Sequence, residues 1–278
     1  MDESKPTDRA VSATVSAPVV AVLGLGEAGG RLAADLVSLG VEVRGYDLAT
    51  TAAPDGVDLT GDPGSAISGS TVVLALTTAA TSLAAAESAL PGLEAGSIYA
   101  DLNTTSPALK RDVAELVARA GAQFADVALL GPVPARGLGT PALASGPGAQ
   151  AFAEAFRPLG MPVEVVSDRP GDAAIRKLLR SVFLKGLAAS ALESLRAADA
   201  AGHSKWLEEE IAAVIGEPLL TRVVEGSRRH AARRVDEMEA ASELLRELGV
   251  EPRIAAASAA VLAAIAAGEP TGGAGVRS

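Results

Sequence analysis

The sequence predicts an α/β protein in two parts: a doubly wound parallel sheet of the Rossmann type, followed by an all-helical domain. Three observations support this fold class. Short apolar runs rich in β-branched residues alternate with helical patterns up to about Ser167, as in βαβ units. A glycine-rich turn follows the first apolar run, and no strand pattern occurs from Asp172 onward. We therefore expect a Rossmann domain over residues 18–167 and a helical domain over residues 168–268.

The glycine-rich turn comes directly after the predicted strand Pro18–Leu23. It consists of Gly24, Leu25, Gly26, Glu27, Ala28 and Gly29, which fit G-x-G-x-x-G. In this fingerprint the three glycines permit a tight bend, a close approach of the backbone to a pyrophosphate, and close packing of helix on strand. Free N–H groups at the helix start bind phosphate. We therefore predict that these six residues bind a dinucleotide, against the alternative of an ordinary tight turn.

The acidic residue that completes the fingerprint is Asp47, at the end of the predicted strand Val41–Tyr46 and 23 residues after Gly24. A carboxylate there accepts the adenosine ribose hydroxyls and repels a 2′-phosphate, which favours NAD over NADP as cofactor. Thr77 and Thr78 follow another buried strand, at the edge where open α/β sheets bind their ligands. We count both threonines among the cofactor-binding residues.

The remaining elements of the first domain follow the same alternation. Further strands are predicted over residues 71–76, 97–101, 123–130 and 163–166, and helices over 79–90, 108–120 and 152–159. Ser106 and Pro107 are expected as N-cap and first residue of the second of these helices. Four prolines and five glycines make Gly131 to Gly148 an ordered but irregular passage.

The second domain shows only helical periodicity, in segments at 172–198, about 204–250 and 252–267. A small helical domain with an alanine-rich last helix needs a partner surface, so we expect a homodimer. Residues 1–17 lack periodicity and are expected to be a disordered tail, and 269–278 a flexible one.

The composition excludes several classes of function. The net charge of −10 argues against nucleic acid or an anionic membrane surface as partner. With no cysteine and two distant histidines, we expect no disulfide, thiol nucleophile or metal site. The start of the chain lacks the pattern of a signal peptide, and the apolar stretch at 254–267 is too short to span a bilayer. A cytoplasmic location is therefore expected.

Four motifs in fixed order resemble the β-hydroxyacid dehydrogenase family, which includes 3-hydroxyisobutyrate and 6-phosphogluconate dehydrogenases. The first motif is the glycine turn. The others are Asp101–Pro107, similar to D-x-S-T-x-x-P, Asp126–Val133, similar to D-A-P-V-S-G-G, and Gly171–Lys177, similar to G-x-G-x-x-x-K. The resemblance covers about residues 18–190. It implies a 6-phosphogluconate-dehydrogenase-like helical domain and hydride transfer between nicotinamide and a small β-hydroxy acid or related carbonyl compound.

The resemblance also implies site residues. Lys177 matches the catalytic lysine of the family, which acts as general acid/base. Substrate binding, to a small molecule with a carboxylate, is implied for Asn103, Thr104, Gly131, Pro132, Ser181 and His230. The chain departs from the family pattern at three of these positions: Asn103 replaces a serine, Pro132 a glycine and Ser181 an asparagine. These departures indicate a separate branch, and they leave the identity of the substrate open.

Several alternatives stay open at this point. Lys185, two helical turns after Lys177, is the rival for the catalytic lysine. His230 lies in a cluster of arginines that either closes over an anionic substrate or pairs with acids on its own helix face. For the whole chain, the alternatives to a dehydrogenase are an imine reductase-like enzyme, whose relatives usually lack the lysine, and a non-catalytic dinucleotide-binding protein.

Overall fold

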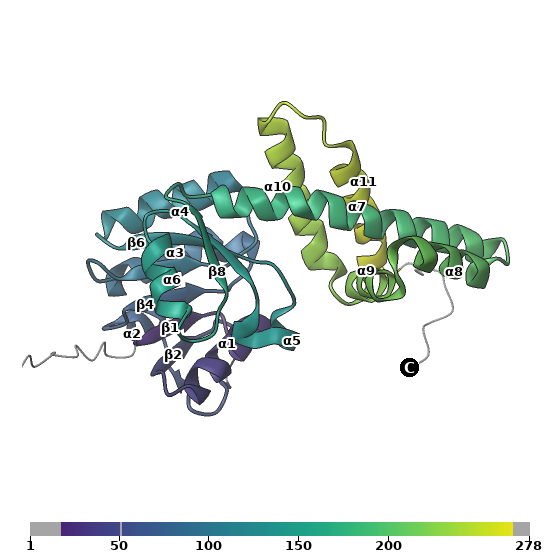
Figure 1. Ribbon diagram of the computed structural model, residues 1–278. Coiled ribbons are helices and arrows are strands. Elements are labelled where there is room, and N and C mark those ends of the chain that lie inside the picture. Colours follow the sequence, from purple (N-terminus) through teal and green to yellow (C-terminus); the bar gives the residue numbers. More distant parts are fainter. Residues whose placement is uncertain (1–17, 51, 269–278) are drawn as a thin grey trace, which may run out of the picture.

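The structure of the chain is a computed structural model that describes residues 18–50 and 52–268. The tails predicted at 1–17 and 269–278 lie outside these residues. Figure 1 shows an α/β domain, a helical domain, and the long helix α7 (Asp172–Ala200) that runs from the first into the second. The last strand ends at Ser167, and we propose the domain boundary between Ser167 and Asp172.

The α/β domain contains one sheet of eight strands in the order β3-β2-β1-β4-β5-β6-β7-β8. The strands are β1 (Val20–Leu23), β2 (Val43–Tyr46), β3 (Asp58–Leu59), β4 (Val72–Ala75), β5 (Ile98–Asp101), β6 (Gln123–Leu129), β7 (Ala142–Ser145) and β8 (Val163–Ser167). Strands β1 to β6 are parallel, as predicted. β7 is antiparallel to β6, and β8 is parallel to β7, so the last two strands run in the opposite direction. The predicted fold class is confirmed.

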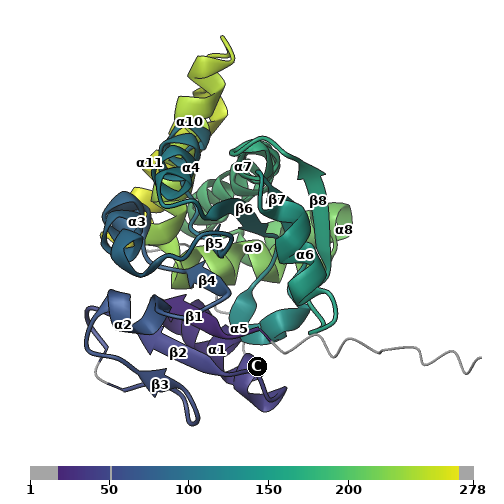
Figure 2. The same cartoon turned by 90° about the vertical axis from the view of Figure 1, so that its left-hand side faces the viewer.

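Helices cover both faces of this sheet (Figure 2). They are α1 (Glu27–Ser38), α2 (Pro63–Ile67), α3 (Ser82–Ala89), α4 (Pro107–Arg119), α5 (Val133–Arg136) and α6 (Ala149–Phe156). Helices α1 and α6 pack on one face, and α2, α3 and α4 on the other. All four residues of β1 are therefore buried, which explains its continuous apolar run. Ser106 accepts a hydrogen bond from the Leu109 N–H, so the predicted N-cap is confirmed.

The sequence interpretation was wrong for the passage from Gly131 to Gly148, which contains α5 and strand β7. The residues of β7, Ala142 to Ser145, are small except for Leu143, and none of them is β-branched. They are extended because they lie between β6 and β8 and bond to both. The two-residue strand β3 was missed for the same reason, since only its pairing with β2 marks it.

The helical domain consists of most of α7 and four further helices: α8 (Ser204–Ile215), α9 (Glu217–Arg229), α10 (Ala231–Glu247) and α11 (Arg253–Ala266). The predicted segment 204–250 is thus three helices, separated at Gly216 and His230. Gly216 has φ +82°, which a glycine adopts without strain. Helix α10 packs against α7 and α11, and Leu178, Met238 and Leu262 lie in their common core. No helix of the described ranges is long and apolar enough to cross a membrane.

A buried polar network ties the sheet to the start of α7. Lys110 of α4 is 1% exposed, and its Nζ donates to the Asp101 carbonyl at 2.8 Å. The same Nζ lies 3.3 Å from Asp101 Oδ2 and 3.2 Å from Asp126 Oδ1. The other oxygen of Asp126 accepts from the Ala174 N–H at 2.9 Å and from the Ser145 hydroxyl at 3.1 Å. One amine and the positive end of helix α7 together balance two buried carboxylates.

We expect Lys110→Met to lower the free energy of unfolding by about 3–5 kcal/mol, because it leaves two buried carboxylates without their cation. Urea unfolding followed by circular dichroism measures this change. Lys205→Met is the matched control, since Lys205 is 90% exposed and 3.8 Å from its partner Glu209. The control should unfold like the parent protein. Equal losses in the two variants would contradict this account of the network.

Candidate active site

The glycine turn has the backbone geometry of a pyrophosphate cradle. At Gly24, with φ +95°, an added Cβ would lie 2.4 Å from the Leu76 carbonyl oxygen. At Gly29 it would lie 1.8 Å from the Gly24 carbonyl oxygen. Gly26 differs, because nothing lies within 4 Å of an added Cβ. Gly26 is also the N-cap of α1 and no side chain caps this helix, so its first N–H groups face open space that fits a phosphate.

Asp47 lies against this turn. Its Oδ2 accepts from the Leu25 N–H at 2.7 Å, and its Oδ1 accepts from the N–H groups of Ala49 at 2.8 Å and Thr50 at 2.9 Å. Burial raises the pKa of Asp47, but these backbone hydrogen bonds outweigh burial and hold the pKa below its ordinary value. The carboxylate is therefore charged at neutral pH and fixed beside the turn, where it can accept further hydrogen bonds from ribose hydroxyls.

The two threonines after β4 lie at the same edge of the sheet. The Thr77 N atom is 3.1 Å from the Cβ position built on Gly24, so Thr77 is a neighbour of the turn. Thr78 is exposed and begins a short helical turn in which its hydroxyl lies 2.9 Å from the Thr81 hydroxyl. The turn, Asp47 and these threonines thus gather at the carboxyl ends of β1, β2 and β4, as the sequence predicted.

Lys177 lies on the second turn of α7, and its Nζ donates to the Thr104 hydroxyl at 2.7 Å. It lines a narrow pocket together with Asn103, Thr104, Thr105 and Asp126. Within the described part of the chain, the buried atoms Asn103 Oδ1 and Thr105 Oγ1 have no hydrogen-bond partner. Unpaired buried polar atoms are costly and call for a ligand or water as partner. The pocket therefore combines an amine with acceptors suited to a hydroxyl-bearing ligand.

The surroundings of Lys177 favour its neutral form. Burial is the largest effect and lowers the pKa of Lys177 from its ordinary 10.5 to about 8. Glu237 opposes this change, whereas the positive charges of Lys185, Lys110 and Arg233 add to it. An amine with this pKa exchanges protons readily near neutral pH, which is the property that a general acid/base needs.

Lys185, the rival lysine, is paired with a carboxylate. Its Nζ lies 2.9 Å from Glu237 Oε1 and 3.2 Å from the Ser181 hydroxyl. The Ser181 hydroxyl itself donates to Glu237, so it faces this pair and not the pocket. Burial raises the pKa of Glu237, but Lys185 and Lys177 outweigh burial and lower it to about 2. Glu237 is therefore ionised and neutralises Lys185.

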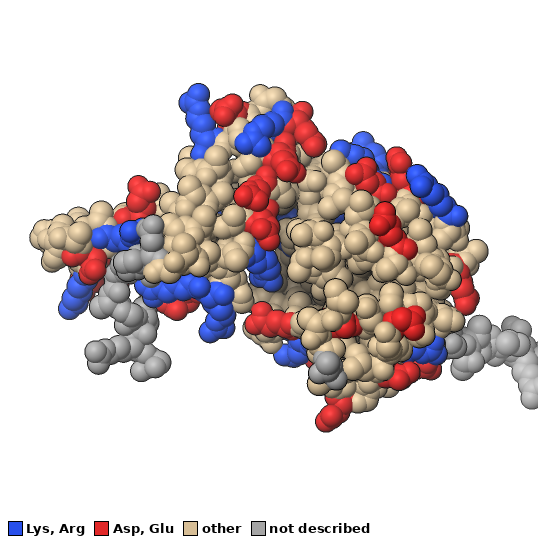
Figure 3. Space-filling model, turned by 180° about the vertical axis from the view of Figure 1, so that it is seen from behind, with Lys and Arg blue, Asp and Glu red and all other residues tan. Residues whose placement is uncertain are grey.

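His230 lies between α9 and α10 and is partly buried. Burial and the charge of Arg233 lower the pKa of His230, and Glu27 at the start of α1 opposes them. His230 is thus close enough to the turn to respond to Glu27, although the two residues belong to different domains. Figure 3 shows that the surface is hollowed between these domains.

Gly131 and Pro132 lie directly after β6, outside the lining of the Lys177 pocket. Pro132 is exposed and is the N-cap of α5. The short helix α5 and the turn after it are held on α1: Asp35 Oδ2 accepts from the Leu138 N–H at 2.9 Å, and Arg31 donates to the Pro134 carbonyl at 2.8 Å. This segment is therefore fixed relative to the glycine turn.

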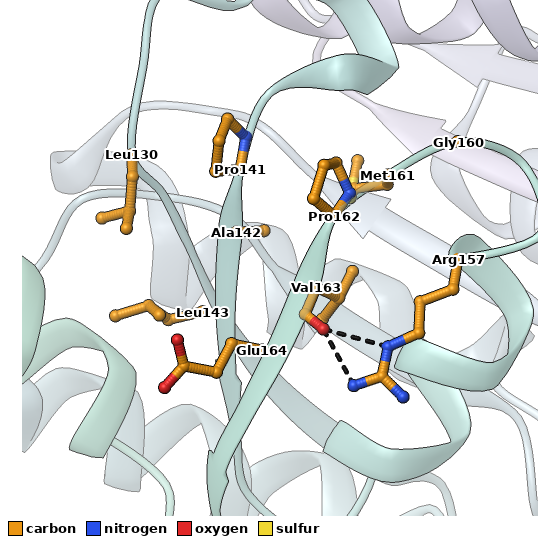
Figure 4. A pocket seen from close by; sticks show the side chains of 10 residues that line it. All are labelled: Leu130, Pro141, Ala142, Leu143, Arg157, Gly160, Met161, Pro162, Val163 and Glu164. Carbon is orange, nitrogen blue, oxygen red and sulfur yellow. Dashed lines mark hydrogen bonds between the residues drawn. The ribbon is translucent and has the colours of Figure 1, made fainter.

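The larger hollow of the molecule, about 560 Å³, lies elsewhere, between β7, β8 and the segment before β8 (Figure 4). Apolar side chains dominate its lining, and Arg157 in its wall donates twice to the Val163 carbonyl. None of the predicted site residues lines it. Its lining has one carboxylate, the exposed Glu164 that pairs with Arg176, and no lysine, histidine or hydroxyl, so we place the active site at the smaller pocket around Lys177.

Two participants in this site were not singled out from the sequence. Asp126 was read only as part of a motif, and its burial next to Lys110 depends on the pairing of β5 and β6. Glu237 was one of the acids considered as partners for the arginines near His230; its hydrogen bonds go to α7, and the charge of Arg234 also acts on it. The sequence contained a signal that Glu237 is buried, because the apolar residues Met238 and Ala241 lie on the same side of α10. Within the described residues, no group of three or more His, Asp or Glu could hold a metal ion.

The sequence matches known families over most of its length. The NAD binding domain of 6-phosphogluconate dehydrogenase matches residues 19–160, just over half of the chain. A domain of unknown function, DUF1932, matches residues 198–265. Together with the turn and Asp47, the first match defines a nicotinamide dinucleotide-binding protein of the dehydrogenase type. The chain belongs to the β-hydroxyacid dehydrogenase family, as the motifs indicated.

Two proteins whose names state no activity are similar to this chain. An uncharacterized 28.5 kDa protein of Methanothermus fervidus is 30% identical over 145 residues, which are 51% of this chain and 55% of that protein. The chain therefore spans about half the length of this curated relative. A conserved hypothetical protein from Sinorhizobium meliloti 1021 has a solved structure with 29% identity and a TM-score of 0.71, covering 92% of this chain and 91% of that one.

Two enzymes share the fold at lower identity. Mycobacterium tuberculosis 3-hydroxyisobutyrate dehydrogenase, solved with L-serine, is 20% identical with a TM-score of 0.76, over 92% of this chain and 96% of its own. Streptomyces aurantiacus imine reductase is 23% identical with a TM-score of 0.62, over 90% of this chain and 94% of its own. The likeness of these two structures concerns the fold alone.

The two glycines of the turn provide a matched pair of variants. Gly26→Ala should keep the unfolding temperature of the parent protein, because its new methyl group meets no protein atom, yet weaken dinucleotide binding by at least about tenfold. Gly29→Ala should lower the unfolding temperature, because its methyl group would overlap the Gly24 carbonyl. Calorimetric titration and thermal unfolding measure the two effects. Unchanged binding by Gly26→Ala would place the phosphates away from this turn.

Proposed function

We propose that the protein is an NAD-dependent oxidoreductase that transfers a hydride between nicotinamide and a small β-hydroxy acid or the related carbonyl compound, with Lys177 as general acid/base. The observation that carries this proposal is the environment of Lys177. Its amine has a pKa of about 8, lies in a pocket with unpaired buried acceptors, and occupies the position of the family's catalytic lysine.

The residues of the pocket have the following roles in the proposed reaction. In alcohol oxidation, neutral Lys177 accepts the proton of the substrate hydroxyl, and in carbonyl reduction the charged form donates it to the substrate oxygen. Thr104, which already bonds the amine, and Asn103 orient the substrate oxygens. When bound, the nicotinamide accepts or supplies the hydride.

The helical domain supplies positive charge near the pocket that would attract a substrate carboxylate. Arg233 is exposed and acts electrostatically on both Lys177 and His230. We propose that this positive field, with His230 closing over the substrate, selects an anionic compound. From the family pattern we also propose that Gly131, Pro132 and Ser181 belong to the substrate site. Ser181 would act through Glu237, to which its hydroxyl is bonded.

No observation favours the alternatives specifically. The imine reductase shares the fold at 23% identity, and the lysine that such enzymes usually lack is present here with an altered pKa. A non-catalytic dinucleotide-binding protein would have no need for that amine. Turnover with a panel of hydroxy acids and NAD⁺ separates these functions.

Lys177→Ala should lower turnover by about 10²–10⁴-fold and leave NAD affinity unchanged, because the phosphates bind at the distant glycine turn. In the parent enzyme, kcat/KM for oxidation should rise with pH through about 8, since the neutral amine is the reactive form, and that for reduction should fall above it. Stopped-flow and steady-state kinetics measure these changes. Lys205→Ala, an exposed lysine, is the control. Full activity of Lys177→Ala would favour a reduction that needs no lysine.

The proposed preference for NAD over NADP follows from the charged carboxylate of Asp47. We expect NADP to bind at least about tenfold more weakly than NAD. Asp47→Asn combined with Leu48→Arg should reverse this order. Leu48 is 89% exposed, so an arginine there can reach a 2′-phosphate, and the side-chain amide oxygen at position 47 can still accept hydrogen bonds from the backbone N–H groups. Leu48→Arg alone is the control. Comparable binding of the two cofactors by the parent protein, measured by calorimetry, would refute the preference.

We also propose a homodimer formed through the helical domain. Large apolar side chains are exposed there, among them Phe183 at 69%, Trp206 at 61% and Val214 at 83%. Burial of such side chains drives association. Light scattering at micromolar concentration should give twice the mass of the chain. A monomer under these conditions would show that the helical domain is stable with this surface exposed.

A further inference from the structure

Helix α7 presents two lysines to one carboxylate. Lys177, Ser181 and Lys185 follow each other at spacings of four residues and so lie on the same face of the helix. Glu237 of α10 faces this row and accepts from Ser181 and Lys185 through the same oxygen, Oε1. The amine of Lys177 bonds to Thr104 instead. The single anion of this row is thus bonded to the lysine that is farther from the pocket.

The other charged groups around Lys177 do not replace Glu237. Arg233 of α10, Lys110 of α4 and Lys185 are all positive. Asp126 of β6 lines the same pocket, and its charge is taken up by Lys110 and by the start of α7. Among the described residues whose charges act on Lys177, Glu237 is therefore the anion able to bind it.

The charge of Arg234 also acts on Glu237, so Arg234 is the group that could compete with Lys185 for this carboxylate. Arg234 of α10 and Arg180 of α7 act on Lys185 and are also positive. Arg234 donates to the Ser227 hydroxyl and to the Val223 carbonyl, so its bonds point toward α9. A buried carboxylate that lost Lys185 would turn to the nearest remaining amine, because an unpaired buried charge is strongly unfavourable. That amine is Lys177.

We propose that Lys185 is a positioning residue for the reaction: it holds the Glu237 carboxylate two turns along α7 and thereby leaves the Lys177 amine free to exchange a proton. This inference rests on the proposed function of Lys177 as general acid/base. It gives the rival lysine a role that differs from catalysis.

The sign of the effect follows from charge. A carboxylate bonded to Lys177 stabilises the ammonium form, so loss of Lys185 should raise the pKa of Lys177 from about 8 toward its ordinary 10.5. The neutral amine would then be scarce at neutral pH. Oxidation should slow there and recover at high pH, whereas a catalytic Lys185 would leave no activity at any pH.

The test uses the full chain with Lys185→Met and reads Lys177 directly. The pH dependence of its acetylation by trace acetic anhydride, followed by mass spectrometry without substrate, gives its pKa. We expect a rise of at least about one unit, which corresponds to about a tenfold loss of oxidation rate at pH 7.5. The rate should approach that of the parent enzyme near pH 10. An unchanged pKa of Lys177 would overturn the proposal.

A double-variant cycle separates movement of Glu237 from simple loss of the Lys185 charge. Lys185→Met with Glu237→Gln removes both charges, so the pKa of Lys177 should return to about 8 or below, and the rate at pH 7.5 should recover. In the Glu237→Gln background, Lys185→Met should change the pKa far less than in the parent. Equal changes in both backgrounds would mean that Lys185 acts only by repulsion, and this result also overturns the proposal.

A second variant and a comparison with turnover distinguish the remaining outcomes. If Lys185→Met does not fold, Lys185→Gln serves in its place, with a rise in the pKa of Lys177 expected again. The pKa measurement needs no turnover. A shift as expected in a protein that turns over no hydroxy acid would support the arrangement of charges and overturn the proposed reaction. An unchanged pKa in an active enzyme would overturn only the role of Lys185.

Discussion

The rest of the structure depends on one buried amine. Lys110 lies between the carboxylates of Asp101 and Asp126 on neighbouring parallel strands, and the second oxygen of Asp126 accepts from the Ala174 N–H in the first turn of α7. Buried charges are tolerated only when they are paired, so the register of β5 and β6, the position of α4 and the start of α7 are fixed together. The catalytic candidate Lys177 stands one turn beyond that anchor.

Other lysines in this region are less completely paired with carboxylates than Lys110. Lys110 has two carboxylates within 3.3 Å and serves as a structural cation. Lys185 has one carboxylate, and Lys177 has a hydroxyl as its partner. Three buried or half-buried lysines within one region thus have three different environments. Burial disfavours the ammonium form, and the pKa of Lys177, whose partner is a hydroxyl, falls to about 8.

The first βαβ unit was predictable from the sequence because local signals agree there. Gly24 and Gly29 of the turn have no room for side chains, α1 begins where the fingerprint places it, and Asp47 bonds to the turn. Strand β7 was missed because pairing with its neighbours, not its own residues, makes it extended. The bond between Ser181 and Glu237 joins residues 56 positions apart. Sequence spacing within one helix contains no information on such a contact, so the pairing of Glu237 with Lys185 became visible only in the folded chain.

The length of α7 has a mechanical consequence. Its first N–H groups are bonded to Asp126 and Ser145 of the sheet, and Lys177 follows only three residues after Ala174. Lys177 therefore moves with the domain that holds the dinucleotide turn. Further along the same helix, Ser181 and Lys185 bond to Glu237 of α10, whose charge acts on Lys177. One continuous helix thus joins the sheet to the carboxylate that acts on the amine, so the same element sets both the position of the amine and its electrostatic surroundings.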